Sequence, residues 1–210
     1  MEIFKEACVE TYEQAILAQK NGVNRIELCG DLSVGGVTPD FALTQRLLVE
    51  LTIPIRVMVR PRGGNFVYST SELEEMKTTI LTFKKMEVEG VVFGILKEDN
   101  TINLNENQTL ANLAKPLKVT FHKAIDTTND ILGEFSKLLK ISEIDTVLTS
   151  GGKPTALEGM PILKEMIKLA GDKITILSAG KITNENLSKL HQKIGGTAYH
   201  GRKIVGNLTV

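Results

Sequence analysis

The sequence predicts an α/β fold, a closed (β/α)8 barrel of the TIM type, in a single domain over residues 1–210. Three observations favour this fold. Runs of β-branched residues recur along the whole chain, most of them alternate with stretches whose apolar residues have helical spacing, and polar residues gather just after the runs. An open, doubly wound sheet is the alternative, but its polar residues would gather around one switch point.

The chain is expected to form eight strands, which suits a barrel. We place their beginnings near Ile3, Arg25, Ile55, Gly90, Lys118, Asp145, Ile174 and Thr197. Small or polar turns introduce several of them, as in NGVNRIEL, EVEGVVF and SEIDTVL, which is typical of a helix that ends before the next strand. Because only ten residues follow His200, we expect the eighth helix to be short or missing.

Two of the intervening helices have clear sequence patterns. The segment TYEQAILAQK places four residues on one helical face, namely Tyr12, Ala15, Ile16 and Gln19. The segment TSELEEMKTTILTFKKM is expected to begin with Ser71 as its cap, since Glu74 follows three residues later as in a capping box.

Composition excludes several classes of protein. The 25 basic and 25 acidic residues cancel, so no overall field would draw the protein to nucleic acid or to an anionic membrane. No apolar run is long enough to span a bilayer, and the amino terminus does not resemble a signal peptide, so a cytoplasmic location is expected. Two cysteines in a chain of this size predict free thiols rather than a disulfide framework.

Alternation along the first two strands places acids and thiols on the same faces. Glu6 and Cys8 are two residues apart on the first strand, and Glu27 and Cys29 are two apart on the second. Neighbouring strands lie about 4.8 Å apart, so the two thiols could share one soft ion, and two thiolates suit Cu(I). The alternative is that both cysteines are small buried hydrophobic residues.

The two glutamates need cationic partners if they point into the barrel. A buried carboxylate is costly unless it is paired, so we expect Glu6 and Glu27 to meet Arg or Lys in the mouth. Arg60 and Arg62, in IRVMVRPRGGNF, are the candidates, and two arginines beside a double glycine also favour anion binding. A turn with two solvated arginines is the alternative.

Histidines mark the ends of two later strands. VTFHKAID places His122 and Lys123 at a strand end with Asp126 shortly after them, which are the components of a general acid or base with an orienting carboxylate. His200 ends the last strand and is a second candidate, whereas His191 is expected to be a surface or packing residue of the preceding helix.

Small residues follow the sixth and seventh strands, in LTSGGKP and LSAGKIT. They are expected to offer backbone N–H groups to a phosphate or another anion, as loops in many barrels do: Ser150, Gly151, Gly152, Ala179 and Gly180. HGRKIVG after the eighth strand is expected to do likewise. Glycines that end helices are the alternative interpretation.

Taken together, these motifs resemble the CutC family of copper homeostasis proteins. The resemblance runs from about Ile3 to about Val205 and rests on EAC, RIELCGDLSVGGVTP, VMVRPRGGNFVYS, GVVFG, VTFHKAID, VLTSGG and the terminal histidine strand. It implies a barrel fold, a cytoplasmic location, a homodimer or larger homo-oligomer, and copper handling that includes Cu(I) binding. Many members of the family also continue well past the final strand.

By the same resemblance, the copper ligands match Cys8 and Cys29. The polar residues of the family's mouth match Glu6, Glu27, Arg60, Arg62, His122, Asp126, Ser150 and His200. One departure is that Lys123, Ala124 and Ile125 stand where the family often has arginine, alanine and phenylalanine, which weakens the case for bidentate anion binding there.

Two functions therefore compete. The first is Cu(I) binding or handling through the two cysteines. The second is an enzyme of unknown reaction that acts on a small anionic molecule, phosphorylated or sugar-like. In the enzyme, the catalytic residues would be Glu6, Glu27, His122, Asp126 and His200, and the substrate-binding residues would be Arg60, Arg62, Lys123, Ser150, Gly151 and Gly180.

Overall fold

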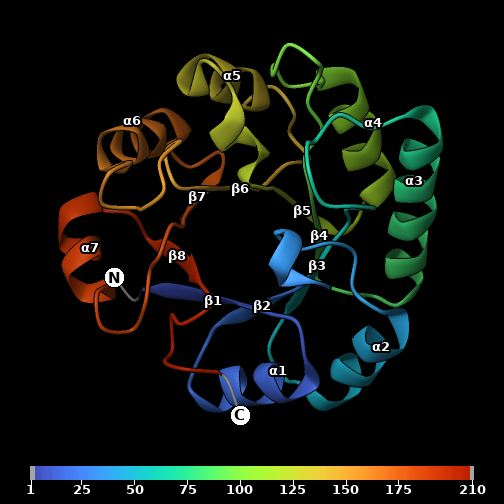
Figure 1. The fold of residues 1–210 in the computed structure, drawn as a ribbon, viewed down its shortest axis with the longest axis horizontal. Helices are drawn as coiled ribbons and strands as arrows, with labels where there is room; N and C mark the ends of the chain where they lie inside the picture. The colour runs from blue at the N-terminus through green and yellow to red at the C-terminus, as the bar shows by residue number, and fades with distance from the viewer. Residues whose placement is uncertain (1–2, 209–210) are drawn as a thin grey trace.

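Eight parallel strands close into a barrel in chain order, from β1 next to β2 round to β8 next to β1 (Figure 1). This computed structural model describes residues 3–208. The strands are β1 (Phe4–Val9), β2 (Arg25–Leu28), β3 (Ile55–Met58), β4 (Gly90–Phe93), β5 (Lys118–Phe121), β6 (Thr146–Thr149), β7 (Thr175–Ser178) and β8 (Ala198–Gly201). The predicted (β/α)8 barrel is therefore confirmed.

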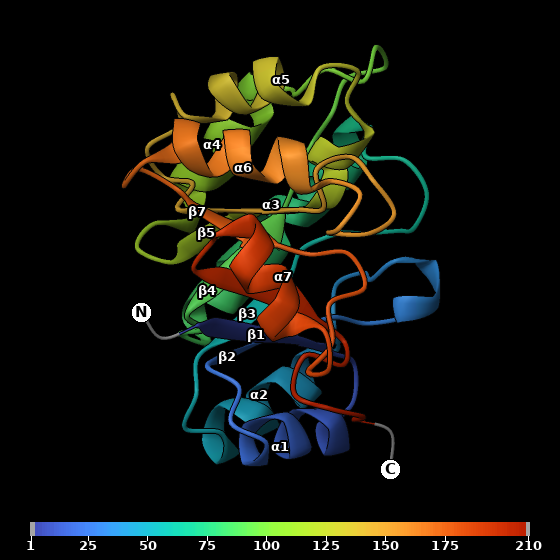
Figure 2. The same cartoon turned by 90° about the vertical axis from the view of Figure 1, so that its left-hand side faces the viewer.

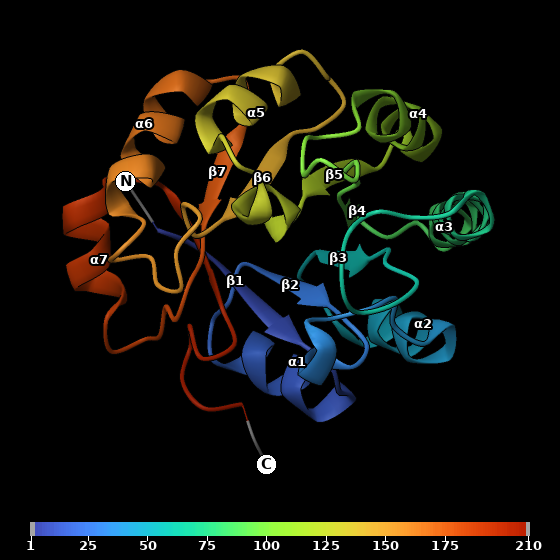
Figure 3. The same cartoon turned by 45° about the horizontal axis from the view of Figure 1, so that its top comes forward.

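Helices surround the strands as an outer ring, and each follows its strand around the barrel (Figures 1 and 3). They are α1 (Tyr12–Lys20), α2 (Phe41–Glu50), α3 (Thr70–Lys85), α4 (Leu104–Ala114), α5 (Ile131–Leu138), α6 (Met160–Ala170) and α7 (Leu187–Ile194). Two short 3-10 helices lie in loops, η1 (Leu32–Val34) and η2 (Lys123–Thr127), and η1 stands out from the side of the barrel in Figure 2.

The strands begin at or within one residue of their predicted positions. The strand positions could be predicted because a parallel barrel buries both faces of its strands. Such strands are short continuous apolar runs bounded by turns. Between β8 and Leu208 no helix forms, so the expectation of a missing eighth helix holds for the part of the chain described here. None of the helices within residues 3–208 is long and apolar enough to cross a membrane.

The predicted start of the long third helix is wrong by two residues. Ser69, not Ser71, caps α3: its hydroxyl accepts from the Glu72 N–H, and the Glu72 carboxylate accepts from the Ser69 N–H at 2.7 Å. Both serines have a glutamate three residues later, so the sequence pattern fits both positions. Only Ser69 has the extended backbone of a cap, with φ −70° and ψ 165°.

A charged layer crosses the barrel interior at the level of Arg56 in β3. Its guanidinium donates to Glu89 at 2.7 Å and to Asp145 at 2.8 Å. It also donates to the hydroxyls of Thr120 and Thr146, at 2.6 Å and 3.0 Å. Because Arg56 is almost fully buried, these four partners offset the cost of removing its charge from water.

Candidate functional site

A large pocket opens at the carboxyl ends of the strands, with a volume of about 1040 Å³. Residues at the ends of β1, β2, β3, β5, β6, β7 and β8 line it, together with residues of the loop that carries η1. Among the predicted site residues, those that line it are Cys8, Glu27, Cys29, Arg60, His122, Lys123, Asp126, Ser150, Gly152, Ala179, Gly180 and His200. A pocket of this size accommodates a small organic molecule as well as an ion.

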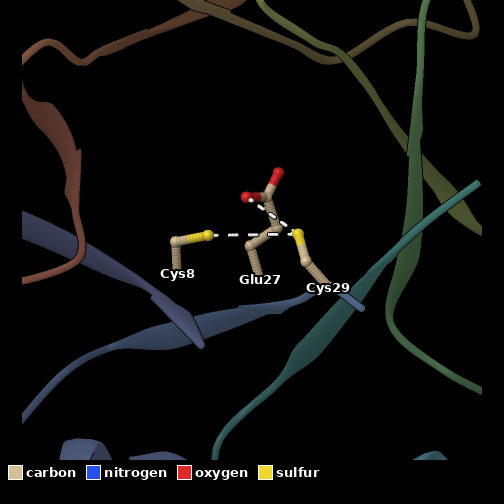
Figure 4. A group of neighbouring side chains, drawn as sticks. All are labelled: Cys8, Glu27 and Cys29. Atoms are coloured by element: carbon tan, nitrogen blue, oxygen red, sulfur yellow. Dashed lines mark hydrogen bonds between the residues drawn. The ribbon is translucent and has the colours of Figure 1, made fainter. Parts of the chain in front are cut away.

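The two thiols lie together on one wall of this pocket. The Cys8 and Cys29 sulfurs are 3.9 Å apart, and the Cys29 sulfur lies 3.6 Å from a Glu27 carboxylate oxygen (Figure 4). One ligand atom from each of the three side chains lies within 4.8 Å of the others. Both cysteines are free thiols and are buried.

The stagger between neighbouring strands produces this cluster. In the register of β1 and β2, Cys8 pairs with Glu27 and Glu6 pairs with Arg25, so Cys29 lies two residues beyond the partner of Cys8 along its strand. Cys29 directly follows β2, and its N–H still donates to the Val9 carbonyl at 2.9 Å, which keeps it beside the end of β1.

Glu6 lies beneath the pocket and joins two cationic side chains. Its carboxylate accepts from Arg25 Nε at 2.5 Å and contacts His200 Nδ1 at 2.8 Å. Burial alone would raise the pKa of Glu6, but Arg25 and His200 outweigh burial and lower it to about 2. Glu6 is thus a permanent anion that orients His200.

Glu27 differs from Glu6 because no arginine in the described part of the chain contacts it. Its pKa is raised, whereas that of Glu6 is lowered. Desolvation and then the neighbouring Cys8 raise the pKa of Glu27 well above its usual value. The nearest cationic group is His200, whose Nε2 lies 3.7 Å from one carboxylate oxygen, and the other oxygen has no hydrogen-bond partner within residues 3–208. Glu27 therefore holds its proton to a higher pH than Glu6 does.

The two thiols also differ. The hydrogen bond between the two sulfurs lowers the pKa of Cys8 to about 5 against the effect of burial, and His200 adds to this. The same hydrogen bond, together with desolvation, raises the pKa of Cys29 well above its usual value. Burial would lower the pKa of His200, but Glu27, Cys8 and Glu6 raise it well above 6.5. The cluster therefore holds a thiolate beside an imidazolium.

Glu6 pairs with an arginine as expected, but the arginine is Arg25. The prediction that Arg60 and Arg62 pair with Glu6 and Glu27 is wrong. Arg60 donates instead to backbone carbonyls of the surrounding loops. Arg62 does not line the pocket: it pairs with Glu72, the glutamate of the α3 capping box, at 2.5 Å. The pairing of Glu6 with Arg25 follows from strand register, which the sequence does not specify.

His122 and Asp126 do not form the expected acid–base pair. His122 Nδ1 accepts a hydrogen bond from the Ala124 N–H at 3.2 Å, and its Nε2 has no partner among residues 3–208. Desolvation and the nearby Arg60 lower the pKa of His122 to about 3, so its imidazole is neutral. The Asp126 carboxylate instead pairs with Lys123, whose Nζ also donates to Ser150.

Asp126 also occupies the backbone groups that were expected to hold a phosphate. It accepts from the N–H groups of Ser150 and Gly152, at 3.0 Å and 2.9 Å, and from the Thr149 hydroxyl at 2.5 Å. The Gly151 N–H donates to Thr149, and Gly151 does not line the pocket. The Ala179 N–H bonds to the Thr149 carbonyl in the sheet. An internal carboxylate therefore fills this glycine-rich loop.

Three residues that matter to the pocket were not predicted. Arg25 could have been found, because it is two residues before Glu27 and so shares its face of β2. Phe66, which packs its ring against His122, and Thr149, which binds Asp126, have no distinguishing sequence signal. The predicted role of His191 as a packing residue agrees with its contacts to Tyr199 and the Gly196 carbonyl.

Comparisons with known proteins agree with the fold and the motifs. A family model described as the CutC family matches residues 3–205. A Homo sapiens protein named copper homeostasis protein cutC homolog is 40% identical over 195 residues, which are 93% of this chain and 71% of that protein. A CutC family protein from Pasteurella multocida is 37% identical over 93% of this chain and 80% of its own length.

Solved structures give the same result. A crystal structure of a CutC protein from Streptococcus agalactiae has a TM-score of 0.90 at 31% identity, covering 96% of this chain and 99% of that one. A phosphoribosyl anthranilate isomerase from Thermococcus kodakaraensis, with a TM-score of 0.62 at 14% identity, shares the barrel fold alone. By sequence and by structure, this chain belongs to the CutC family.

Proposed function

We propose that this protein takes part in cytoplasmic copper homeostasis by binding one Cu(I) ion between Cys8 and Cys29. The observation that carries the proposal is the pair of thiol sulfurs, 3.9 Å apart on the wall of a large pocket. Membership of a family whose relatives are named copper homeostasis proteins supports it. Free thiols also suit the reducing cytoplasm.

The spacing of the sulfurs suits one shared ion. With metal–sulfur bonds of about 2.3 Å and an S–metal–S angle of about 120°, two thiolates lie about 4 Å apart. The observed distance of 3.9 Å needs little movement of either side chain. The bent angle leaves a third position, and the Glu27 carboxylate lies on that side of the pair.

The identity of the ligands favours a soft ion. Thiolates select Cu(I) and other soft ions, whereas carboxylates and water suit Mg²⁺ and Ca²⁺. Cys8 already has thiolate character, so the ion has to displace a proton only from Cys29. The apolar neighbours Leu32, Met58 and Val92 pack around the thiols and limit the access of water to the ion.

The test is an anaerobic titration of Cu(I) against a competing chromogenic chelator. Wild-type protein is expected to bind one ion per chain, and the double variant Cys8→Ser, Cys29→Ser is expected to lose this site. Met58→Leu is the matched control, because it removes a thioether sulfur from the same cluster and leaves both thiols in place. Unchanged stoichiometry and affinity in the double variant, with folding verified by thermal unfolding, would rule out the thiol site.

A further inference from the structure

Arg60 carries a buried positive charge that no carboxylate compensates. Its side chain lines the pocket at 4% exposure, and its hydrogen bonds go to the carbonyls of Val34, Gly36 and Gly64. Its Nε has no hydrogen-bond partner within residues 3–208. A buried guanidinium held by neutral dipoles alone is costly, and an anion in the pocket would offset that cost.

His122 presents an unused hydrogen-bond donor at the same pocket. Because its Nδ1 accepts from the Ala124 N–H, the ring proton of the neutral imidazole is on Nε2. This Nε2–H has no acceptor within the part of the chain described here, although His122 is 97% buried, with a relative exposure of 3%. A buried donor without a partner costs roughly 1–3 kcal/mol, which an acceptor on a ligand would recover.

Packing fixes these two groups relative to each other. The Phe66 ring contacts both groups. The centroids of the Phe66 and His122 rings are 4.8 Å apart, and the Arg60 guanidinium carbon lies 4.8 Å from the Phe66 ring centroid. Gly94 makes room for the imidazole, since a Cβ at this position would lie 2.6 Å from His122 Nδ1. Arg60, Phe66 and His122 thus form one rigid wall of the pocket, which we call the Arg60–His122 wall.

The charges of this wall match a monoanion. Arg60 supplies one uncompensated positive charge, and His122 supplies a neutral donor. The backbone N–H groups of the glycine-rich loop that could have bound a phosphate dianion are filled by Asp126. A carboxylate, with one negative charge and two acceptor oxygens, satisfies both groups.

The rest of the pocket favours an organic ligand over a simple ion. Its volume of about 1040 Å³ far exceeds that of a lone carboxylate, and apolar side chains contribute to its lining: Leu32, Met58, Phe66, Leu148 and Ile182. Such a lining with a few polar groups is typical of a small-molecule site. The rim adds further cations, namely Lys153, Lys181, Arg202 and Lys203, although the whole chain has no net charge.

We propose that the Arg60–His122 wall binds the carboxylate of a small organic monoanion whose apolar part occupies the remainder of the pocket. This site uses neither thiol, so it goes beyond copper binding and does not depend on it. The protein would then hold an organic ligand and a metal site in one pocket, on different walls.

The test uses three probes of similar shape: benzoate, the neutral benzamide, and the dianion phenyl phosphate. Binding is measured by isothermal titration and by the change in the NMR signal of the His122 side chain. Benzoate is expected to bind wild-type protein more tightly than either of the other probes. Equal binding of benzamide, tighter binding of phenyl phosphate, or no binding of benzoate would each overturn the proposal.

Variants locate the site. His122→Phe keeps an aromatic ring against Phe66 but removes the donor, and it is expected to weaken benzoate binding about tenfold or more. Arg62→Met is the matched control, because Arg62 lies outside the pocket and should leave benzoate binding unchanged. Unchanged affinity in His122→Phe would overturn the proposal, and thermal unfolding verifies that each variant is folded.

Failure of this proposal is distinguishable from failure of the copper site. The Cys8→Ser, Cys29→Ser variant is expected to bind benzoate with wild-type affinity, and His122→Phe is expected to retain one Cu(I) per chain. Loss of benzoate binding in the cysteine variant would place the anion at the thiols and contradict a separate site.

Discussion

Glu6 and Glu27 are the same residue type on adjacent strands, yet their pKa values shift in opposite directions. Glu6 lies between Arg25 and His200, which lower its pKa to about 2 in spite of burial. Glu27 lies among the thiols with no arginine in contact, and burial raises its pKa. Glu6 therefore serves as a fixed charge, whereas Glu27 holds its proton more tightly beside the two thiols.

His122 is another buried titratable group of the pocket, and its protonation opposes folding. Desolvation and Arg60 lower its pKa to about 3 from an ordinary value of 6.5. Below pH 6.5 the unfolded chain takes up a proton at this residue that the folded protein does not. Stability from the neutral imidazole is therefore complete above about pH 6.5 and is lost as the pH falls towards 3.

The matching prediction compares wild-type protein with His122→Phe by urea unfolding at several pH values. The free energy of unfolding of the wild type is expected to fall more steeply between pH 6.5 and 4 than that of the variant, by a few kcal/mol over the window. Because other acids titrate equally in both proteins, the difference isolates His122. Parallel pH profiles would contradict a neutral buried imidazole.

At the scale of elements, helix α3 is joined to the loop after β3 through its cap. Glu72 closes the capping box with Ser69 and also binds Arg62, so the arginine that was expected to bind anions instead holds the start of a helix. The helix was predicted correctly from the sequence, but its N-cap was not. Local spacing alone does not distinguish two serines that lie two residues apart.

This assignment predicts different effects for the two serines. Ser69→Ala is expected to lower the free energy of unfolding by about 1 kcal/mol, because it removes the acceptor for the Glu72 N–H. Ser71→Ala, the matched control, removes an exposed hydroxyl that lies 3.0 Å from the Ser69 hydroxyl, and it should have a much smaller effect. A larger loss for Ser71→Ala in thermal or urea unfolding would contradict the cap.

Elements could be read from the sequence better than contacts between them. Strand positions followed from β-branched runs and turns, and the acids and thiols of β1 and β2 followed from alternation. Arg25 rather than Arg60 pairs with Glu6 because strand register decides which side chains meet. Asp126 fills the glycine-rich loop after β6 because η2 places its carboxylate there. A sequence motif does not predict that placement.

At the scale of the whole molecule, closure of the barrel turns distant segments into one site. Pairing of β8 with β1 places His200 beside Glu6, and η2 and the loops after β6 and β7 complete the opposite wall. The expectations of a single domain over residues 1–210 and of a homodimer or larger homo-oligomer stay predictions. The fold and the family follow from independent comparisons.

The most direct measurement is an anomalous-scattering crystal structure of the protein loaded anaerobically with Cu(I). If Cu(I) binds at the two thiols, one copper peak per chain is expected between the Cys8 and Cys29 sulfurs on the wall of the barrel pocket. The sulfurs are expected to remain about 4 Å apart. A copper peak elsewhere, or none at the two thiols, would contradict the proposed copper site.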